Sequence, residues 1–119
     1  MEDVKTPEQE LQDKIDAKVI ELEKKHSCVI TPVHFKTPEG EDVIGYLKTP
    51  NRVTKLRTLD QYTRSRATAA AQLLDLVIIK EESDPRIYSE LPENDDYYIG
   101  ASFAANNLVG IADNIFKKK

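Results

Sequence analysis

The chain has 119 residues, of which 39% are hydrophobic and 32% charged, and its formal net charge is −4. This composition is typical of a folded globular domain and unlike that of a disordered chain. The negative net charge argues against a protein that mainly coats nucleic acid or an anionic membrane surface.

The length predicts a single domain over residues 1–119, with flexible ends at 1–5 and 117–119. No apolar run approaches the about 18 residues needed to span a bilayer. The polar, acidic start of the sequence has no signal-peptide pattern. Cys28 is the only cysteine, so no disulfide can form within the chain, and we expect a reducing, cytosolic compartment.

A first helix is predicted to begin after Thr6. Thr6 is a favourable N-cap, Pro7 suits the first helical position, and Gln9 can complete a capping box. Apolar residues then recur at helical spacing and predict one buried stripe, formed by Leu11, Ile15, Val19 and Leu22.

Residues 27–48 predict a β-hairpin whose turn is Pro38-Glu39-Gly40. This turn places Phe35 opposite Val43 and Lys36 opposite Asp42. The register brings five apolar residues to one face, namely Val29, Val33, Phe35, Val43 and Leu47. Since two strands alone are marginal in water, helices must cover that face.

Thr49 is predicted to cap a second helix, with Pro50 at its first position, that continues to about Tyr62. After a break at 63–65, an alanine-rich and then apolar segment predicts a third helix that is packed on more than one side. Its β-branched end at 76–79 could instead form a short strand. The tripeptide Lys-Thr-Pro occurs at 5–7, 36–38 and 48–50, where we interpret it as helix-start and turn chemistry rather than as phosphorylation sites.

Residues 80–94 form a polar connection of unusual length, which Ile87 and Tyr88 could pin to the body of the protein. The last helix is predicted to begin at Asn94 or Asp95. Its inner stripe consists of Tyr97, Ala101, Ala104, Leu108, Ile111 and Ile115. The predicted class is α+β and mostly helical, with an N-terminal helix, one antiparallel β-hairpin, and three or four packed helices.

The sequence offers little for catalysis or metal binding. His26, Cys28 and His34 are too few and too unevenly spaced for a zinc site. Cys28 and His34 would lie about 20 Å apart along one strand, beyond hydrogen-bonding distance. No catalytic or phosphate-binding motif is present. We therefore predict a protein that is not an enzyme, with no catalytic residues, no metal and no cofactor.

Charge is unevenly distributed along the chain. Residues 48–66 contain six basic residues and one acidic residue, and residues 81–96 contain seven acidic residues and one basic residue. These segments could pair within the fold or remain solvated, or they could drive head-to-tail self-association. Binding of nucleic acid by the basic segment is less favoured because it lacks interleaved aromatic residues. The candidate charged interface consists of Lys48, Arg52, Lys55, Glu81, Glu82, Asp95 and Asp96, with the three basic residues on one helical face.

Residues 20–112 resemble a family of small proteins encoded by tailed bacteriophages and prophages. In that family a β-hairpin ends in an aromatic residue, a basic residue, proline and arginine, a helix then runs into an apolar segment, and an acidic pair opens the last helix. The matching positions are Tyr46, Lys48, Pro50, Arg52, Leu73, Leu74, Val77, Ile78, Asp95 and Asp96.

The resemblance implies a non-enzymatic role in virion assembly, similar to that of a tail-assembly chaperone. Such a protein would bind a tape-measure or other tail or capsid polypeptide in the host cytoplasm, and could remain in the virion. The expected partner-binding face is apolar and consists of Leu73, Leu74, Val77, Leu108 and Ile111. Two alternatives remain: a structural virion component that self-associates through its charged segments, such as a head–tail connector or capsid-associated protein, and a small host-takeover or nucleic-acid-binding factor.

Overall fold

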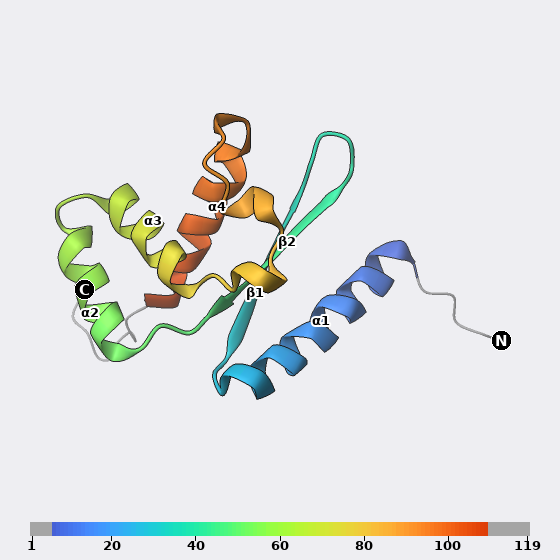
Figure 1. The fold of residues 1–119 in the computed structure, drawn as a ribbon, viewed down its shortest axis with the longest axis horizontal. Coiled ribbons are helices and arrows are strands. Elements are labelled where there is room, and N and C mark those ends of the chain that lie inside the picture. Colours follow the sequence, from blue (N-terminus) through green and yellow to red (C-terminus); the bar gives the residue numbers. More distant parts are fainter. Residues whose placement is uncertain (1–5, 110–119) are drawn as a thin grey trace, which may run out of the picture.

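The computed structural model describes residues 6–109 and shows a mostly helical α+β fold, as the sequence predicted. The hairpin runs through the middle of the molecule, with α1 on one side and the other three helices on the other (Figure 1). The elements are α1 (Pro7–His26), β1 (Ile30–Lys36), β2 (Asp42–Lys48), α2 (Arg52–Tyr62), α3 (Arg66–Val77) and α4 (Asp95–Asn106), with short 3₁₀ turns at Lys80–Glu82, Pro85–Ile87, Pro92–Asn94 and Asn107–Val109.

The start of α1 confirms the predicted capping box. The Thr6 hydroxyl accepts a hydrogen bond from the Gln9 N–H at 3.1 Å, and the Gln9 side-chain oxygen accepts one from the Thr6 N–H at 3.1 Å. Two of the N–H groups that a helix start leaves unpaired are thereby satisfied. Of the predicted stripe, Ile15 and Leu22 are buried, whereas Leu11 and Val19 are partly buried against the same cluster.

The register of the hairpin is the predicted one, with Phe35 opposite Val43 and Lys36 opposite Asp42. The prediction for Val29 is wrong, because Val29 precedes β1 and most of its side chain is exposed. The prediction of a single apolar face is also incomplete. One face packs into the larger core with α3 and α4, while the other packs against α1 through Ile30 and Tyr46.

The start of α2 differs from the prediction. The N-cap is Asn51, whose side chain accepts a hydrogen bond from the Thr54 N–H at 2.9 Å. Thr49 instead continues the hairpin, since its hydroxyl donates to the Val29 carbonyl at 2.7 Å. Thr49 and Pro50 therefore belong to the extended segment that precedes α2. The predicted break after Tyr62 is confirmed, and Ser65 caps α3.

Residues 78–84 cover the outer edge of β2. The Ile79 N–H donates to the Tyr46 carbonyl at 3.0 Å, and the Asp84 N–H donates to the Ile44 carbonyl at 2.8 Å. The Tyr46 N–H donates to the Ser83 hydroxyl at 3.0 Å. This edge is thus closed to pairing with another chain. For residues 76–79 the sequence left open whether the chain is helix or strand, and the structure contains some of each. Helix α3 ends at Val77, and the next residue, Ile78, forms an isolated β-bridge with Leu47.

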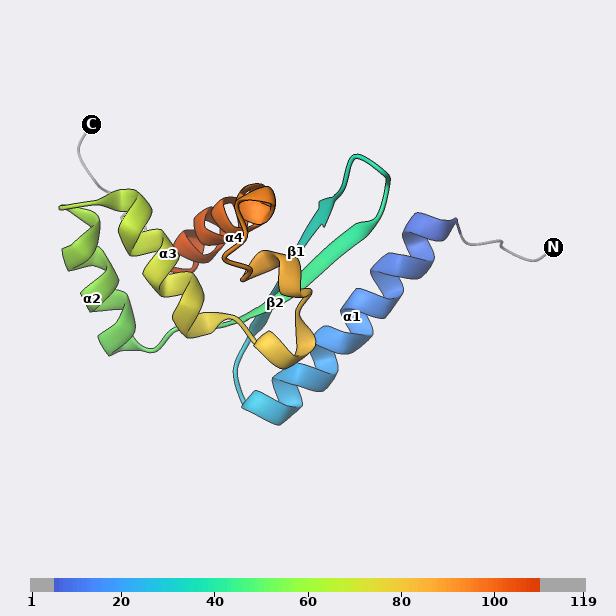
Figure 2. The same ribbon diagram turned by 45° about the horizontal axis from the view of Figure 1, so that its top comes forward.

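Helices α2, α3 and α4 form a layer in which α3 lies between the other two (Figure 2). The polar connection at 80–94 is pinned as predicted, since Ile87 is fully buried and Tyr88 packs against the same core. The last helix begins at Asp95 after Asn94, although the Asn94 side chain makes no capping hydrogen bond. Of the predicted inner stripe, Ala101 is fully buried, whereas Ile111 and Ile115 lie outside the described residues.

Candidate interaction surfaces

The predicted apolar partner face does not lie on the surface. Leu73, Leu74 and Val77 are 1%, 0% and 3% exposed and form the main core with the hairpin. Leu108 is partly buried against that core, and Ile111 lies outside the described residues. The hairpin and α4 both cover α3, which explains why this helix is apolar on several sides. The chain itself therefore buries the predicted partner face.

A different apolar surface is open, in a shallow groove between α3 and α4. Ile99 and Phe103, one turn apart on α4, are 49% and 56% exposed along it. Small side chains on α3 leave the space that forms its floor. The groove has a volume of about 60 Å³ and is lined by Ala67, Ala70, Ala71, Tyr98, Ile99, Ser102 and Phe103. In the sequence, the signals for it were the alanine cluster at 67–71 and the spacing of Ile99 and Phe103.

The two ends of this groove differ in charge. One end is acidic, with Asp75 near Tyr98 and with Asp95 and Asp96 in the first turn of α4. Burial, and secondly the Asp75 carboxylate, raise the pKa of Tyr98. At the other end Arg66 begins α3, and its guanidinium lies 5.3 Å from the centre of the Tyr62 ring. The groove therefore presents an apolar middle between an acidic end and a basic end.

The predicted charged interface is only partly assembled. Lys48 belongs to β2 and not to α2, so it does not share a helical face with Arg52 and Lys55. Glu82 is bound to α1, where the Lys18 ammonium lies 2.7 Å from its carboxylate. Within residues 6–109, no ion pair joins 48–66 to 81–96. Three predicted acidic residues are exposed and make no ion pair with any described residue, namely Glu81, Asp95 and Asp96.

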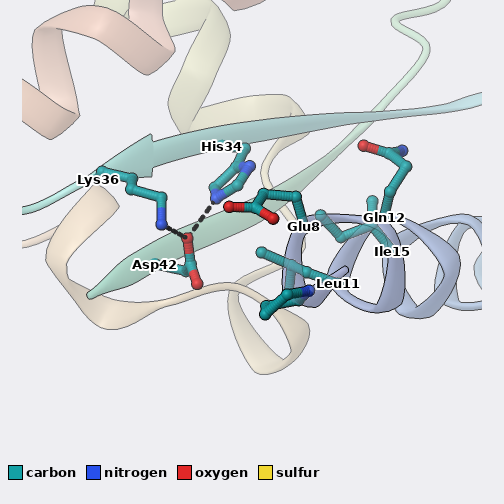
Figure 3. A pocket seen from close by; sticks show the side chains of 8 residues that line it. Glu8, Leu11, Gln12, Ile15, His34, Lys36 and Asp42 are labelled. Carbon is teal, nitrogen blue, oxygen red and sulfur yellow. Dashed lines mark hydrogen bonds and ion pairs between the residues drawn. The ribbon is translucent and has the colours of Figure 1, made fainter. Parts of the chain in front are cut away.

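A hollow of about 290 Å³ lies between the first turns of α1 and the hairpin (Figure 3). The Asp42 carboxylate is held there between the His34 ring at 2.7 Å and the Lys36 ammonium at 3.4 Å. The hydrogen bond from His34 is the main reason that the pKa of Asp42 is lowered. Among residues 6–109, no cysteine, serine or threonine lines the hollow, so these residues offer it no side-chain hydroxyl or thiol nucleophile. It is lined by Pro7, Glu8, Leu11, Gln12, Ile15, His34, Lys36 and Asp42.

The structure brings together two of the three residues that the sequence raised as metal ligands. His26 and Cys28 line a second hollow, of about 300 Å³, together with Lys48 and Leu76. His34 lines the other hollow instead. In the described part of the chain, no three His, Cys, Asp or Glu side chains are grouped so that they could hold a metal ion.

Arg86 ties the 80–94 segment to the turn of the hairpin. Its guanidinium donates to both carboxylate oxygens of Asp84, at 3.1 and 2.9 Å, and to Glu41 at 3.1 Å. The bidentate geometry is the one in which arginine binds carboxylates most strongly. These bonds to Arg86 are the main reason that the pKa of Asp84 is lowered.

Asp84→Asn should therefore make the chain less stable at neutral pH and weaken the response of its stability to acid. A carboxyl with a lowered pKa in the folded state stabilises the fold above its unfolded value of about 3.9, and that stabilisation is lost as the pH falls through the folded value. Urea unfolding at neutral pH and below about pH 4 measures both effects. Glu93→Gln is the matched control, because Glu93 is exposed on the same segment. Equal acid responses of Asp84→Asn and wild type would contradict the expectation.

No helix in residues 6–109 is both long enough and apolar enough to cross a membrane. Comparison with protein-family models, curated proteins and solved structures gives no match. The resemblance to phage proteins thus rests on the sequence pattern alone.

Proposed function

We propose that this chain is a non-enzymatic protein of phage morphogenesis, of the tail-assembly-chaperone type, that binds another viral polypeptide through the α3–α4 groove. It would act in the host cytoplasm during infection. The sequence resemblance supports the viral setting. The observation that carries the binding role is the groove itself, an apolar surface along which the Ile99 and Phe103 side chains are about half exposed.

The size of the groove defines what it can hold. A volume of about 60 Å³ accommodates one aliphatic side chain rather than a cofactor or substrate. The Ile99 and Phe103 side chains beside the groove can cover further apolar residues of the partner, one helical turn from the side chain that enters the groove. The chemistry fits an amphipathic helix that presents its apolar residues at intervals of three and four. Transient cover of such a segment is what a chaperone of an assembling tail polypeptide must provide.

Co-expression with a tape-measure or tail-tube polypeptide tests this proposal. The chain should raise the soluble fraction of that polypeptide and co-purify with it. Phe103→Glu should abolish both effects, because it places a charge in the apolar groove. Ile20→Glu is the matched control, since Ile20 is equally exposed but lies on α1. Unchanged solubility of tape-measure and tail-tube polypeptides with and without the chain would refute the proposal.

A structural virion component that self-associates is the second candidate. One observation favours it, namely that the basic segment at 48–66 and the acidic segment at 81–96 form no ion pair with each other in the described part of the chain. The charges that stay exposed on these segments, such as Arg52, Arg57, Asp95 and Asp96, could then pair with another copy. Detection of the chain in purified particles would distinguish this role from that of a chaperone that leaves before the particle is complete.

A further inference from the structure

We propose that helix α2 of a second copy of this chain docks in the α3–α4 groove, so that copies associate head to tail. This goes beyond the binding of a viral polypeptide, and it holds whether or not the groove also binds one. The argument rests on the surface of α2, on the charges at the end of the groove, and on the position of α2 within its own chain.

Helix α2 has an apolar edge that faces solvent. Val53 and Leu56 lie one turn apart and are each more than half exposed, whereas Thr58 is the only side chain of α2 that is buried. Arg52 and Arg57 lie next to this edge in the sequence, are exposed, and make no ion pair with residues 6–109. An apolar pair between unpaired cations is the surface that an apolar groove with an acidic end would accept.

The groove supplies the complementary charges. Asp95 and Asp96 precede Ile99 by four and three residues, so they lie one turn away from it on α4. Val53 or Leu56 in the groove would bring Arg52 or Arg57 towards these carboxylates. This charge complementarity identifies a second copy as the occupant, because the chain carries both the donor and the acceptor surface.

The contact must form between copies. Within one chain α3 separates α2 from α4 (Figure 2), and both the groove and the apolar edge of α2 remain exposed. Because the two surfaces differ, the contact is heterologous and leaves a free groove at one end and a free α2 at the other. Growth then gives a ring if the rotation between copies closes, and an open filament if it does not. One shallow groove gives a small interface, so the association is weak and depends on concentration and salt.

Sedimentation velocity on the full chain, with two surface variants, tests this arrangement. Wild type should exceed the mass of a monomer as concentration rises, and high salt should reverse this. Leu56→Glu removes the α2 edge and Phe103→Glu removes the groove, so each variant alone should stay monomeric. A mixture of the two should form dimers and nothing larger, because only one complementary pair of surfaces remains. Ile20→Glu should behave as wild type, since it alters neither surface.

Two results would overturn the proposal: wild type that remains monomeric at all concentrations, or a Phe103→Glu variant that associates as wild type does. The second would show that α2 pairs with α2 or with another site. The variants also separate this proposal from the one above. Leu56→Glu should abolish self-association and still bind the viral polypeptide, whereas Phe103→Glu should lose both.

Discussion

Ile87→Ala should destabilise the chain by about 2–5 kcal/mol, although Ile87 lies in a polar segment with little regular structure. Its side chain is fully buried in the main core. The packing around it is tight, since a Cβ atom added to Gly45 would lie 2.6 Å from the Ile87 Cδ1 atom. Removing three carbon atoms would leave a cavity between β2 and the segment that covers its edge. Urea unfolding followed by circular dichroism measures the loss.

Leu91→Ala is the control for this prediction. Leu91 is an aliphatic residue of the same segment but is 57% exposed, so its truncation should change the free energy of unfolding by less than about 0.5 kcal/mol. Similar losses for the two variants would mean that burial of Ile87 does not hold the segment to the sheet.

The features that the sequence predicted well are those decided by neighbours in the chain. The start of α1 follows from Thr6, Pro7 and Gln9, which lie within one turn of the chain and form the capping box and the first helical position. The hairpin register follows from the turn at 38–40, because a one-residue shift would move every side chain to the opposite face. In both cases the competing arrangements lose local interactions, so no knowledge of the tertiary structure is needed.

The errors arose where a distant contact decides between two locally good options. Thr49 and Asn51 are both favourable N-caps, and Asn51 takes that position because Thr49 extends the hairpin by bonding to Val29. The second buried face of the hairpin was missed for the same kind of reason. Tyr46 is buried in a cluster with Ile15 and Leu22 of α1, which lie far from it in the sequence.

The candidate interaction surface shows the same limit. A run of apolar residues such as Leu73, Leu74 and Val77 indicates burial, but the sequence does not say whether the chain itself or a partner covers them. In this fold the hairpin and α4 cover them. The groove that remains open combines α3 and α4, which the long 80–94 segment separates. The alanine cluster on α3 and the apolar pair on α4 are visible in the sequence, but only the packing of the two helices brings them together.

Leu22→Ala should release α1 from the hairpin, with a cost of about 2–5 kcal/mol. Leu22 is fully buried in the smaller core, which α1 shares with Tyr46 and Ile79. Outside that cluster, polar links such as the 2.7 Å ion pair between Lys18 and Glu82 tie α1 to the rest of the chain, and ion pairs that solvent reaches contribute little to stability. The helix therefore depends on its few buried side chains.

Hydrogen exchange distinguishes release of α1 from unfolding of the whole chain. In Leu22→Ala the amides of α1 should exchange at least about tenfold faster, while those of α3 and α4 change less because the larger core is intact. Ile20→Ala, on the exposed side of the same helix, should leave exchange as in wild type. If the amides of α1, α3 and α4 all exchanged equally faster in Leu22→Ala, the two cores would unfold as one unit. The hairpin between them would then carry the loss of stability from the smaller core to the larger one.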